Sequence, residues 1–300
     1  MLNDDSFHSR EYQLSTGTLA SIEYGDPQKA GKTVLFLHGW LDNAASFFSM
    51  MSVWVESDPD CCLIAIDLPG HGLSSHKPGS FYPFHDYIDD IEQLLDEISP
   101  NNLVLVGHSL GALVASCYSA AFPEKVSGLI QIEGYGPLSE SADETITRLR
   151  TGVSSRQRQR KKPSRRLSSL DAAIDLRANV NQIDKALIAP IVERSVILDD
   201  GKWQWRHDKK LQCDSLYRMS PQQAQVIQDA IECPQLIILA EQGFSSLKKA
   251  HNQHSSDTVT ASTQAIEVIT IAGGHHCHLQ NPKQVVELIL GSVNKNETSA

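Results

Sequence analysis

The stretch LVLVGHSLGALVASCYSAA, residues 103–121, decides the fold of this chain. Its first four residues predict a short buried strand, and the apolar run that begins at Ala112 predicts a buried helix. Between them, Gly107, Ser109 and Gly111 form a G-x-S-x-G motif at a sharp turn from strand to helix. Because such a turn projects the serine hydroxyl above the sheet, Ser109 is the candidate nucleophile.

The composition predicts a globular α/β protein that does not bind nucleic acid. The 300 residues are 41% hydrophobic and 21% charged, which is enough for a large core and for one α/β unit that carries an insertion. Lys and Arg number 26 against 36 Asp and Glu, a formal net charge of −10. Nucleic-acid binders are usually basic, so this balance argues against that class of protein.

The apolar region 103–122 is long enough to be considered as a membrane span. A buried strand followed by a buried helix has the same hydropathy, and the Gly-His-Ser interruption at 107–109 favours that interpretation. The polar N-terminal residues do not resemble a secretory signal. The six cysteines show no regular spacing, so we expect reduced thiols in a cytoplasmic protein.

Short apolar runs alternate with helical patterns and predict a parallel sheet with helices on both faces. The predicted strands are residues 34–37, 63–66, 103–106, 129–132, 236–239 and 265–271. Residues 88–98 have apolar side chains at helical spacing, and a closing helix is predicted after Asn281-Pro282. We therefore expect an α/β core formed by residues 1–136 and 233–300.

Residues 137–232 break this pattern and are predicted to be a mostly helical insertion that caps the core. One helix is expected to begin at Ser220, because Ser, Pro and Gln then occupy the N-cap, first and third positions. Residues 148–166 contain nine basic residues and no acidic one. We expect this stretch to be a solvated segment, with attraction of an anionic substrate or a membrane surface as the alternatives.

A serine hydroxyl needs an adjacent base, and candidates cluster in the sequence GGHHCH, residues 273–278, after the last predicted strand. A metal site or a solvated histidine-rich loop would give the same composition. However, zinc usually needs a third or fourth ligand from elsewhere in the chain, and no other Cys/His pair offers itself for that role.

The order of these motifs resembles that of α/β-hydrolases, and more closely that of the serine hydrolase-like family. The resemblance is carried by HGWLDNAASF (38–47), HGLSSH (71–76) and HHCHLQNP (275–282). It implies that His275 is the catalytic base, and that His276 and His278 are structural or line the pocket. It also implies structural roles for His38, His71 and Asp67.

The acid of the expected triad is not settled by the motifs. In α/β-hydrolases it commonly follows the strand predicted at 236–239, but the residue at the usual aspartate position here is Gly243. Two other carboxylates remain. Glu133 directly follows the strand predicted at 129–132, and Glu241 follows the strand at 236–239. We favour Glu133 as the group that orients His275, with Glu241 as the alternative.

The remaining site predictions concern backbone groups and the insertion. By position, the backbone N–H groups of Trp40 and Leu110 are the expected oxyanion donors. Trp203 and Trp205 are candidates for an apolar acyl pocket, although internal packing is the commoner role of such residues in a helical cap.

The expected activity is that of a serine hydrolase that cleaves a small carboxylic ester through an acyl-enzyme. It would use Ser109, His275 and Glu133 on a small-molecule acyl substrate, and no cofactor is implied. Dehalogenases and epoxide hydrolases of this fold use aspartate as the nucleophile, so Ser109 disfavours both. Hydrolysis of a thioester, a lactone or a carbon–carbon bond on the same triad remains an alternative. So does a catalytically silent ligand-binding homologue.

Overall fold

A computed structural model describes residues 6–163, 166–245, 247 and 266–297 of the chain. In these residues an eight-stranded sheet forms the centre of the molecule, with strand order β1-β2-β4-β3-β5-β6-β10-β11. The pairs from β4 to β11 are parallel, whereas β1 with β2 and β2 with β4 are antiparallel. The strands are β1 (His8–Leu14), β2 (Gly17–Tyr24), β3 (Thr33–Leu37), β4 (Cys62–Ile66), β5 (Leu103–His108), β6 (Val126–Ile132), β10 (Gln235–Ala240) and β11 (Ile266–Ile271).

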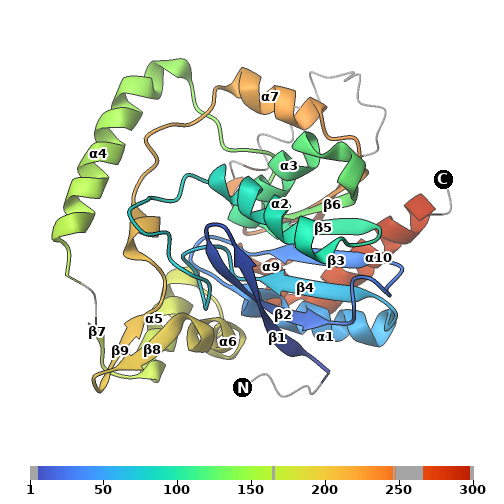
Figure 1. Cartoon of the computed structure of the whole chain (residues 1–300), viewed down its shortest axis with the longest axis horizontal. Helices are drawn as coiled ribbons and strands as arrows, with labels where there is room; N and C mark the ends of the chain where they lie inside the picture. The colour runs from blue at the N-terminus through green and yellow to red at the C-terminus, as the bar shows by residue number, and fades with distance from the viewer. Residues whose placement is uncertain (1–5, 164–165, 246, 248–265, 298–300) are drawn as a thin grey trace.

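Helices cover both faces of this sheet (Figure 1). On one face lie α1 (Phe48–Ser57) and α10 (Pro282–Glu297), which pack against each other, and on the other lie α2 (Asp86–Ile98) and α3 (Leu110–Ala121). The short α9 (Cys277–Gln280) precedes α10, and the 3-10 helix η1 (Ala44–Phe47) precedes α1. The remaining short turns are η2 (Pro123–Lys125), η3 (Ala142–Glu144) and η4 (Lys209–Gln212).

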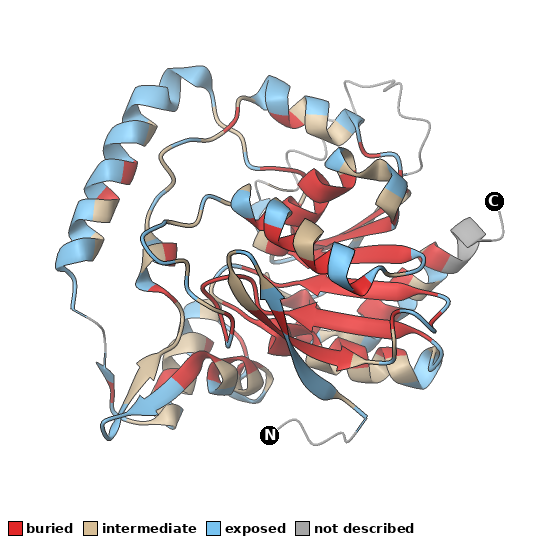
Figure 2. Cartoon of the chain, viewed as in Figure 1, coloured by how far each residue is buried: buried red, intermediate tan, exposed pale blue. Residues whose placement is uncertain are grey.

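The period-2 geometry of the strands divides the core into two layers. Along β3, Val34 and Phe36 point into the layer that α1 and α10 cover, and Leu35 and Leu37 point into the other. Every residue of β3 is buried, which explains why its sequence is a continuous apolar run rather than an alternating one (Figure 2).

The predicted parallel strands and the α2 helix are present, but the N-terminal hairpin of β1 and β2 was not predicted. β1 is an edge strand whose residues are mostly exposed, so its polar sequence lacks an apolar run. The region 103–122 forms β5 and α3, with Phe122 as the C-cap. Among the described residues no helix is long and apolar enough to cross a membrane. All six cysteines are free thiols.

Between β6 and β10 the described residues form four α-helices and a second, small sheet. The helices are α4 (Thr145–Lys161), α5 (Leu170–Asn181), α6 (Lys185–Ser195) and α7 (Pro221–Asp229). The small sheet has the order β7-β9-β8, with β7 (Arg166–Leu167), β8 (Val196–Asp199) and β9 (Lys202–Trp205). We refer to residues 137–232 as the insertion segment.

The prediction of a mostly helical insertion segment did not include these strands, although the sequence carries a signal for them. β8 and β9 are joined by Asp200 and Gly201, whose φ angles are 48° and 68°. An Asp-Gly pair between two short strands is typical of a tight hairpin turn, because both positions require positive φ. By contrast, α7 begins as predicted, with a capping box between Ser220 and Gln223.

Candidate active site

Ser109 lies at the turn between β5 and α3, as the motif predicts. Its backbone has φ 49° and ψ −114°, a strained conformation for a residue with a side chain. The Ser109 N–H donates a hydrogen bond to the carbonyl of Ile132, 2.9 Å away, which ties the turn to the end of β6. A Cβ at Gly111 would overlap the carbonyl oxygen of Leu37, so only glycine lets α3 begin this close to β3.

Glu133 lies at the next strand end, directly after β6. Its backbone also has a positive φ, 48°, and its N–H donates to the carbonyl of Ile238 on β10 at 2.9 Å. The buried carboxylate accepts two backbone hydrogen bonds, from the N–H of Ala240 at 2.6 Å and from that of Phe244 at 3.2 Å. Two strands that are far apart in sequence therefore hold this carboxylate in one position.

His275 follows β11 and faces this carboxylate. Its Nδ1 lies 3.2 Å from Oε2 of Glu133, and 24% of its side chain is exposed against 1% for Glu133. When Nδ1 carries the proton and donates to Glu133, the ring presents Nε2 as a base. Glu241, the alternative acid, is exposed on the loop after β10, and the carboxylate that meets His275 is that of Glu133.

A hydrogen bond from the residue before Ser109 links the candidate nucleophile to the candidate base. His108, which precedes Ser109, donates from Nε2 to the carbonyl oxygen of His275 at 2.8 Å. Among the described residues the Ser109 hydroxyl forms no hydrogen bond with His275. Such contacts are often long in unliganded enzymes and shorten when substrate binds. The exposed Phe244 ring lies 4.4 Å from the His275 ring, centroid to centroid.

Of the two expected oxyanion donors, Leu110 directly follows Ser109 in the chain and Trp40 lies on the loop after β3. Leu110 is the first residue of α3, and its N–H belongs to the helix terminus that has no partner within the helix. In the described part of the chain neither this N–H nor that of Trp40 forms a hydrogen bond. The Trp40 indole, which is 53% exposed, donates to the carbonyl of Leu211 in the insertion segment at 2.9 Å.

Next to the contact between His275 and Glu133, a second histidine–carboxylate contact joins His276 to Asp42. The sequence did not predict it. Nε2 of His276 is 3.1 Å from Oδ2 of the buried Asp42, and the other oxygen of Asp42 is 2.5 Å from a guanidinium nitrogen of Arg177 on α5. Burial opposes ionisation of Asp42, but the adjacent His276 and Arg177 outweigh it and lower the pKa of this carboxyl. Asp42 lies within the HGWLDN motif, but no local pattern points to its partner in the insertion segment.

Two further buried histidines complete the cluster. Burial, and then the neighbouring His278, lower the pKa of His108 well below its usual value. Burial likewise lowers the pKa of His278 to about 3, and its Nε2 lies 2.9 Å from the Ser46 hydroxyl. Both rings are therefore neutral at pH 7. Within the described residues no group of three or more His, Cys, Asp or Glu side chains is placed to hold a metal ion.

His38 and Asp67 hold loops in place. His38 Nδ1 donates to the Gly39 carbonyl at 2.7 Å, and its Nε2 accepts from the Leu68 N–H at 2.9 Å. Asp67 accepts from the Leu73 N–H at 2.7 Å and pairs with Arg194 of α6. These contacts agree with the structural roles that the family resemblance implies.

The two candidate tryptophans of the insertion segment differ in their surroundings. Trp203 packs against a hydrophobic cluster that combines the core layer beneath α1 and α10 with buried residues of α5 and α6. Trp205 also packs against this cluster, but it lines a cavity between the insertion segment and the core.

The sheet order, the strained serine turn and the histidine–carboxylate contact together define an α/β-hydrolase. A family model for the alpha/beta hydrolase fold matches residues 32–282, and the chain belongs to this family.

Individual relatives agree with the resemblance to serine hydrolase-like proteins. A serine hydrolase-like protein of Danio rerio is 27% identical over 265 residues, covering 86% of this chain and 80% of the relative. An esterase of Mycobacterium tuberculosis is 27% identical over 198 residues, covering 65% of this chain and 62% of the relative. The crystal structure of a hypothetical protein from Pseudomonas aeruginosa superposes with a TM-score of 0.83 at 28% identity, covering 94% of this chain and 97% of that one.

Proposed function

We propose that this protein is a serine hydrolase that cleaves a small carboxylic ester through an acyl-enzyme intermediate. The observation that carries the proposal is the contact between Nδ1 of His275 and Oε2 of Glu133 at 3.2 Å, beside the strained turn of Ser109. An imidazole held by a buried carboxylate beside a half-buried serine turn is the arrangement that activates a hydroxyl for acyl transfer.

In the first half-reaction the Ser109 oxygen attacks the carbonyl carbon of the ester while His275 Nε2 takes its proton. The backbone N–H groups of Trp40 and Leu110 stabilise the resulting oxyanion. The carbon–oxygen bond to the alcohol then breaks, and His275 returns the proton to that oxygen. The products are the free alcohol and an acyl-Ser109 ester, and Glu133 stabilises the imidazolium that exists between the two transfers.

In the second half-reaction water replaces the alcohol. His275 removes a proton from water, the hydroxide attacks the acyl carbonyl, and the bond to Ser109 breaks as His275 protonates the serine oxygen. The carboxylic acid leaves, and the original side chains are restored.

We also propose that the insertion segment covers the site as a cap. Three polar contacts join the insertion segment to core residues on the loop after β3. Trp40 bonds to the Leu211 carbonyl, Arg177 pairs with Asp42, and Asn43 Nδ2 donates to the Ser195 hydroxyl at 2.8 Å. Open α/β sheets bind ligands at this edge, so a segment attached there would determine which substrates enter.

A fluorophosphonate probe tests the nucleophile without knowledge of the substrate. We expect the folded protein to be labelled at Ser109 and Ser109→Ala to remain unlabelled, with the site of labelling mapped by mass spectrometry. Absence of labelling, or labelling that is indifferent to Ser109→Ala, contradicts the proposal and favours a silent ligand-binding protein.

A panel of short and medium acyl esters and thioesters tests the reaction. The similarity to an esterase favours esters as the first class to examine. Activity on thioesters or lactones alone would move the function to those substrates while keeping the triad. Inactivity on every ester would count against the proposed bond type.

A further inference from the structure

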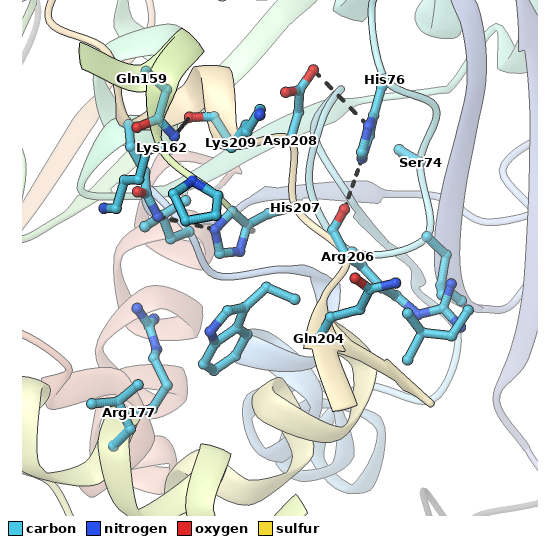
Figure 3. Close-up of a pocket in the computed structure, with 18 of the residues that line it drawn as sticks. Ser74, His76, Gln159, Lys162, Arg177, Gln204, Arg206, His207, Asp208 and Lys209 are labelled. Atoms are coloured by element: carbon cyan, nitrogen blue, oxygen red, sulfur yellow. Dashed lines mark hydrogen bonds and ion pairs between the residues drawn. The ribbon is translucent and has the colours of Figure 1, made fainter. Parts of the chain in front are cut away.

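A cavity of about 820 Å³ lies between the insertion segment and the loop after β4. From the core it is lined by Leu41, Leu73 and His76, and from the insertion segment by residues of α5, β9 and η4. Its volume is within the range of small-molecule sites, roughly 300–1,000 Å³. Figure 3 shows side chains from these segments converging on one space.

The cavity adjoins the candidate active site without containing its reacting groups. Leu41, in its wall, directly follows Trp40, and Arg177 reaches from the wall to Asp42, which contacts His276. Neither Ser109 nor His275 belongs to the described residues that line it. A group bound there would therefore belong to a part of the substrate away from the reacting carbonyl.

The lining of the cavity is positively charged, although the whole chain carries a formal charge of −10. Among the described residues that line it, the cationic side chains are Lys162, Arg177, Arg206 and Lys209, against one carboxylate, Asp208. Asp208 is already engaged, with Lys210 Nζ at 3.0 Å and the Tyr82 hydroxyl at 2.9 Å.

Two of the cations are available to a ligand. In the part of the chain that the structure describes, neither Lys162 nor Lys209 forms an ion pair. They come from different segments, the end of α4 and η4, which are joined by a hydrogen bond from Gln159 Nε2 to the Lys209 carbonyl at 2.7 Å. His207 also lines the cavity but adds no charge at pH 7. Burial, and then the nearby Arg177, lower the pKa of His207 to about 4.

The wall also contains apolar side chains, beside neutral polar ones such as Gln204 and Gln212, and the apolar ones restrict the kind of anion that fits. The apolar lining residues are Leu41, Leu73, Leu176, Val180, Ile197 and Trp205. A small inorganic anion would leave these side chains without a partner. An occupant with an apolar body and one anionic group would complement both parts of the wall.

We propose that this cavity binds the anionic end of the substrate, so that the enzyme selects acyl compounds that carry a carboxylate or phosphate group away from the reacting carbonyl. The proposal rests on the hydrolase function proposed above, because it treats the cavity as a subsite of that reaction. Lys162 and Lys209 are the side chains that provide the charge selectivity.

Binding to the full-length Ser109→Ala protein tests the subsite, because this variant would hold a ligand without consuming it. The probes are two matched pairs: monomethyl glutarate with dimethyl glutarate, and S-acetyl-4′-phosphopantetheine with S-acetylpantetheine. We expect at least one anion to bind about tenfold more tightly than its neutral partner in calorimetry. The pair that shows the preference identifies carboxylate or phosphate as the source of the charge.

The double substitution Lys162→Ala/Lys209→Ala, in the same background, should remove most of this preference. The matched control is Arg158→Ala/Lys161→Ala, which removes two exposed charges of α4 outside the cavity. The control should retain the preference. Three outcomes would overturn the proposal. They are equal affinity for the anionic and neutral probes, no measurable binding of either anion at millimolar concentration, and an equal loss of the preference in both double variants.

The outcomes separate this inference from the proposed function. Fluorophosphonate labelling of Ser109 together with indifference to ligand charge would remove the subsite and leave the hydrolase. A charge preference that depends on Lys162 and Lys209, with no labelling and no turnover, would leave an anion-binding cavity and remove the hydrolase.

Discussion

Gly243 and Glu133 occupy adjoining space at the end of the sheet: a Cβ atom at position 243 would overlap the carboxylate of Glu133. The relationship follows from the pairing of β6 with β10, in which Ile132 lies opposite Ile238. Residues that follow these two strands therefore meet, although more than a hundred positions separate them. An acid placed after either strand would therefore lie near His275, so a glycine at position 243 is compatible with a carboxylate supplied by Glu133.

The first prediction separates the two candidate acids. Glu133→Gln should lower kcat by about 10²- to 10⁴-fold, because the amide cannot stabilise the imidazolium of His275. The matched variant Glu241→Gln should stay within about twofold of wild type, since polar changes on an exposed loop have small effects. The measurement is ester hydrolysis at pH 7. If only Glu241→Gln lowers kcat, the acid is Glu241, and if neither does, the triad is wrong.

The second prediction concerns the space at position 243. Gly243→Ala should displace the Glu133 carboxylate and lower kcat, whereas Gly291→Ala, where a new Cβ meets nothing within 4 Å, should not. In the Glu133→Ala background, Gly243→Asp should raise kcat at least about tenfold by supplying an acid from the neighbouring strand. Failure of this rescue in a correctly folded double variant would show that the two positions are not equivalent.

The third prediction concerns the attachment of the insertion segment. Nε of Arg194 on α6 lies 3.0 and 2.9 Å from the two oxygens of Asp67, which is fully buried. Arg194→Met should lower the free energy of unfolding by about 3–5 kcal/mol, because it leaves a buried charge without its partner. Lys185→Met, which breaks an exposed pair with Asp175, should lower it far less, because solvent screens that pair. Urea denaturation measures both, and equal losses would contradict the prediction.

The fourth prediction is a loss of stability in acid that involves His278. Its folded pKa of about 3 lies below the ordinary value of 6.5, so between these pH values the unfolded chain binds a proton that the folded protein does not. Stability should therefore fall as the pH is lowered from 6.5 towards 3, with His278 contributing roughly 2 kcal/mol between pH 7 and pH 5.

The variant His278→Gln should reduce that loss, while its amide can still bond to the Ser46 hydroxyl. Unfolding free energies at the two pH values are compared within each protein, so any general destabilisation by the substitution cancels. A pH dependence identical to that of the wild type would show that His278 does not titrate as its burial implies.

Much of the fold was predictable because its signals are local. Each buried parallel strand is a continuous apolar run, and α7 begins with a capping box that the sequence displays. β1 was missed because an exposed edge strand has no apolar run. The β8–β9 hairpin was missed although Asp200 and Gly201 are a recognised turn pair, since the surrounding polarity favoured a helical interpretation.

The sequence by itself determined the local structure of one short segment: the strand, the tight turn between glycines and the helix that together present Ser109. It also determined that His275 follows the last strand. Only the tertiary structure decided which carboxylate meets His275, because that depends on β6 lying next to β10 in the sheet. The same holds for Arg177 beside Asp42 and for the charged cavity, whose walls come from segments that no sequence pattern joins. Turns and strands depend on interactions between near neighbours in the chain, whereas a site is formed by residues that only folding brings together.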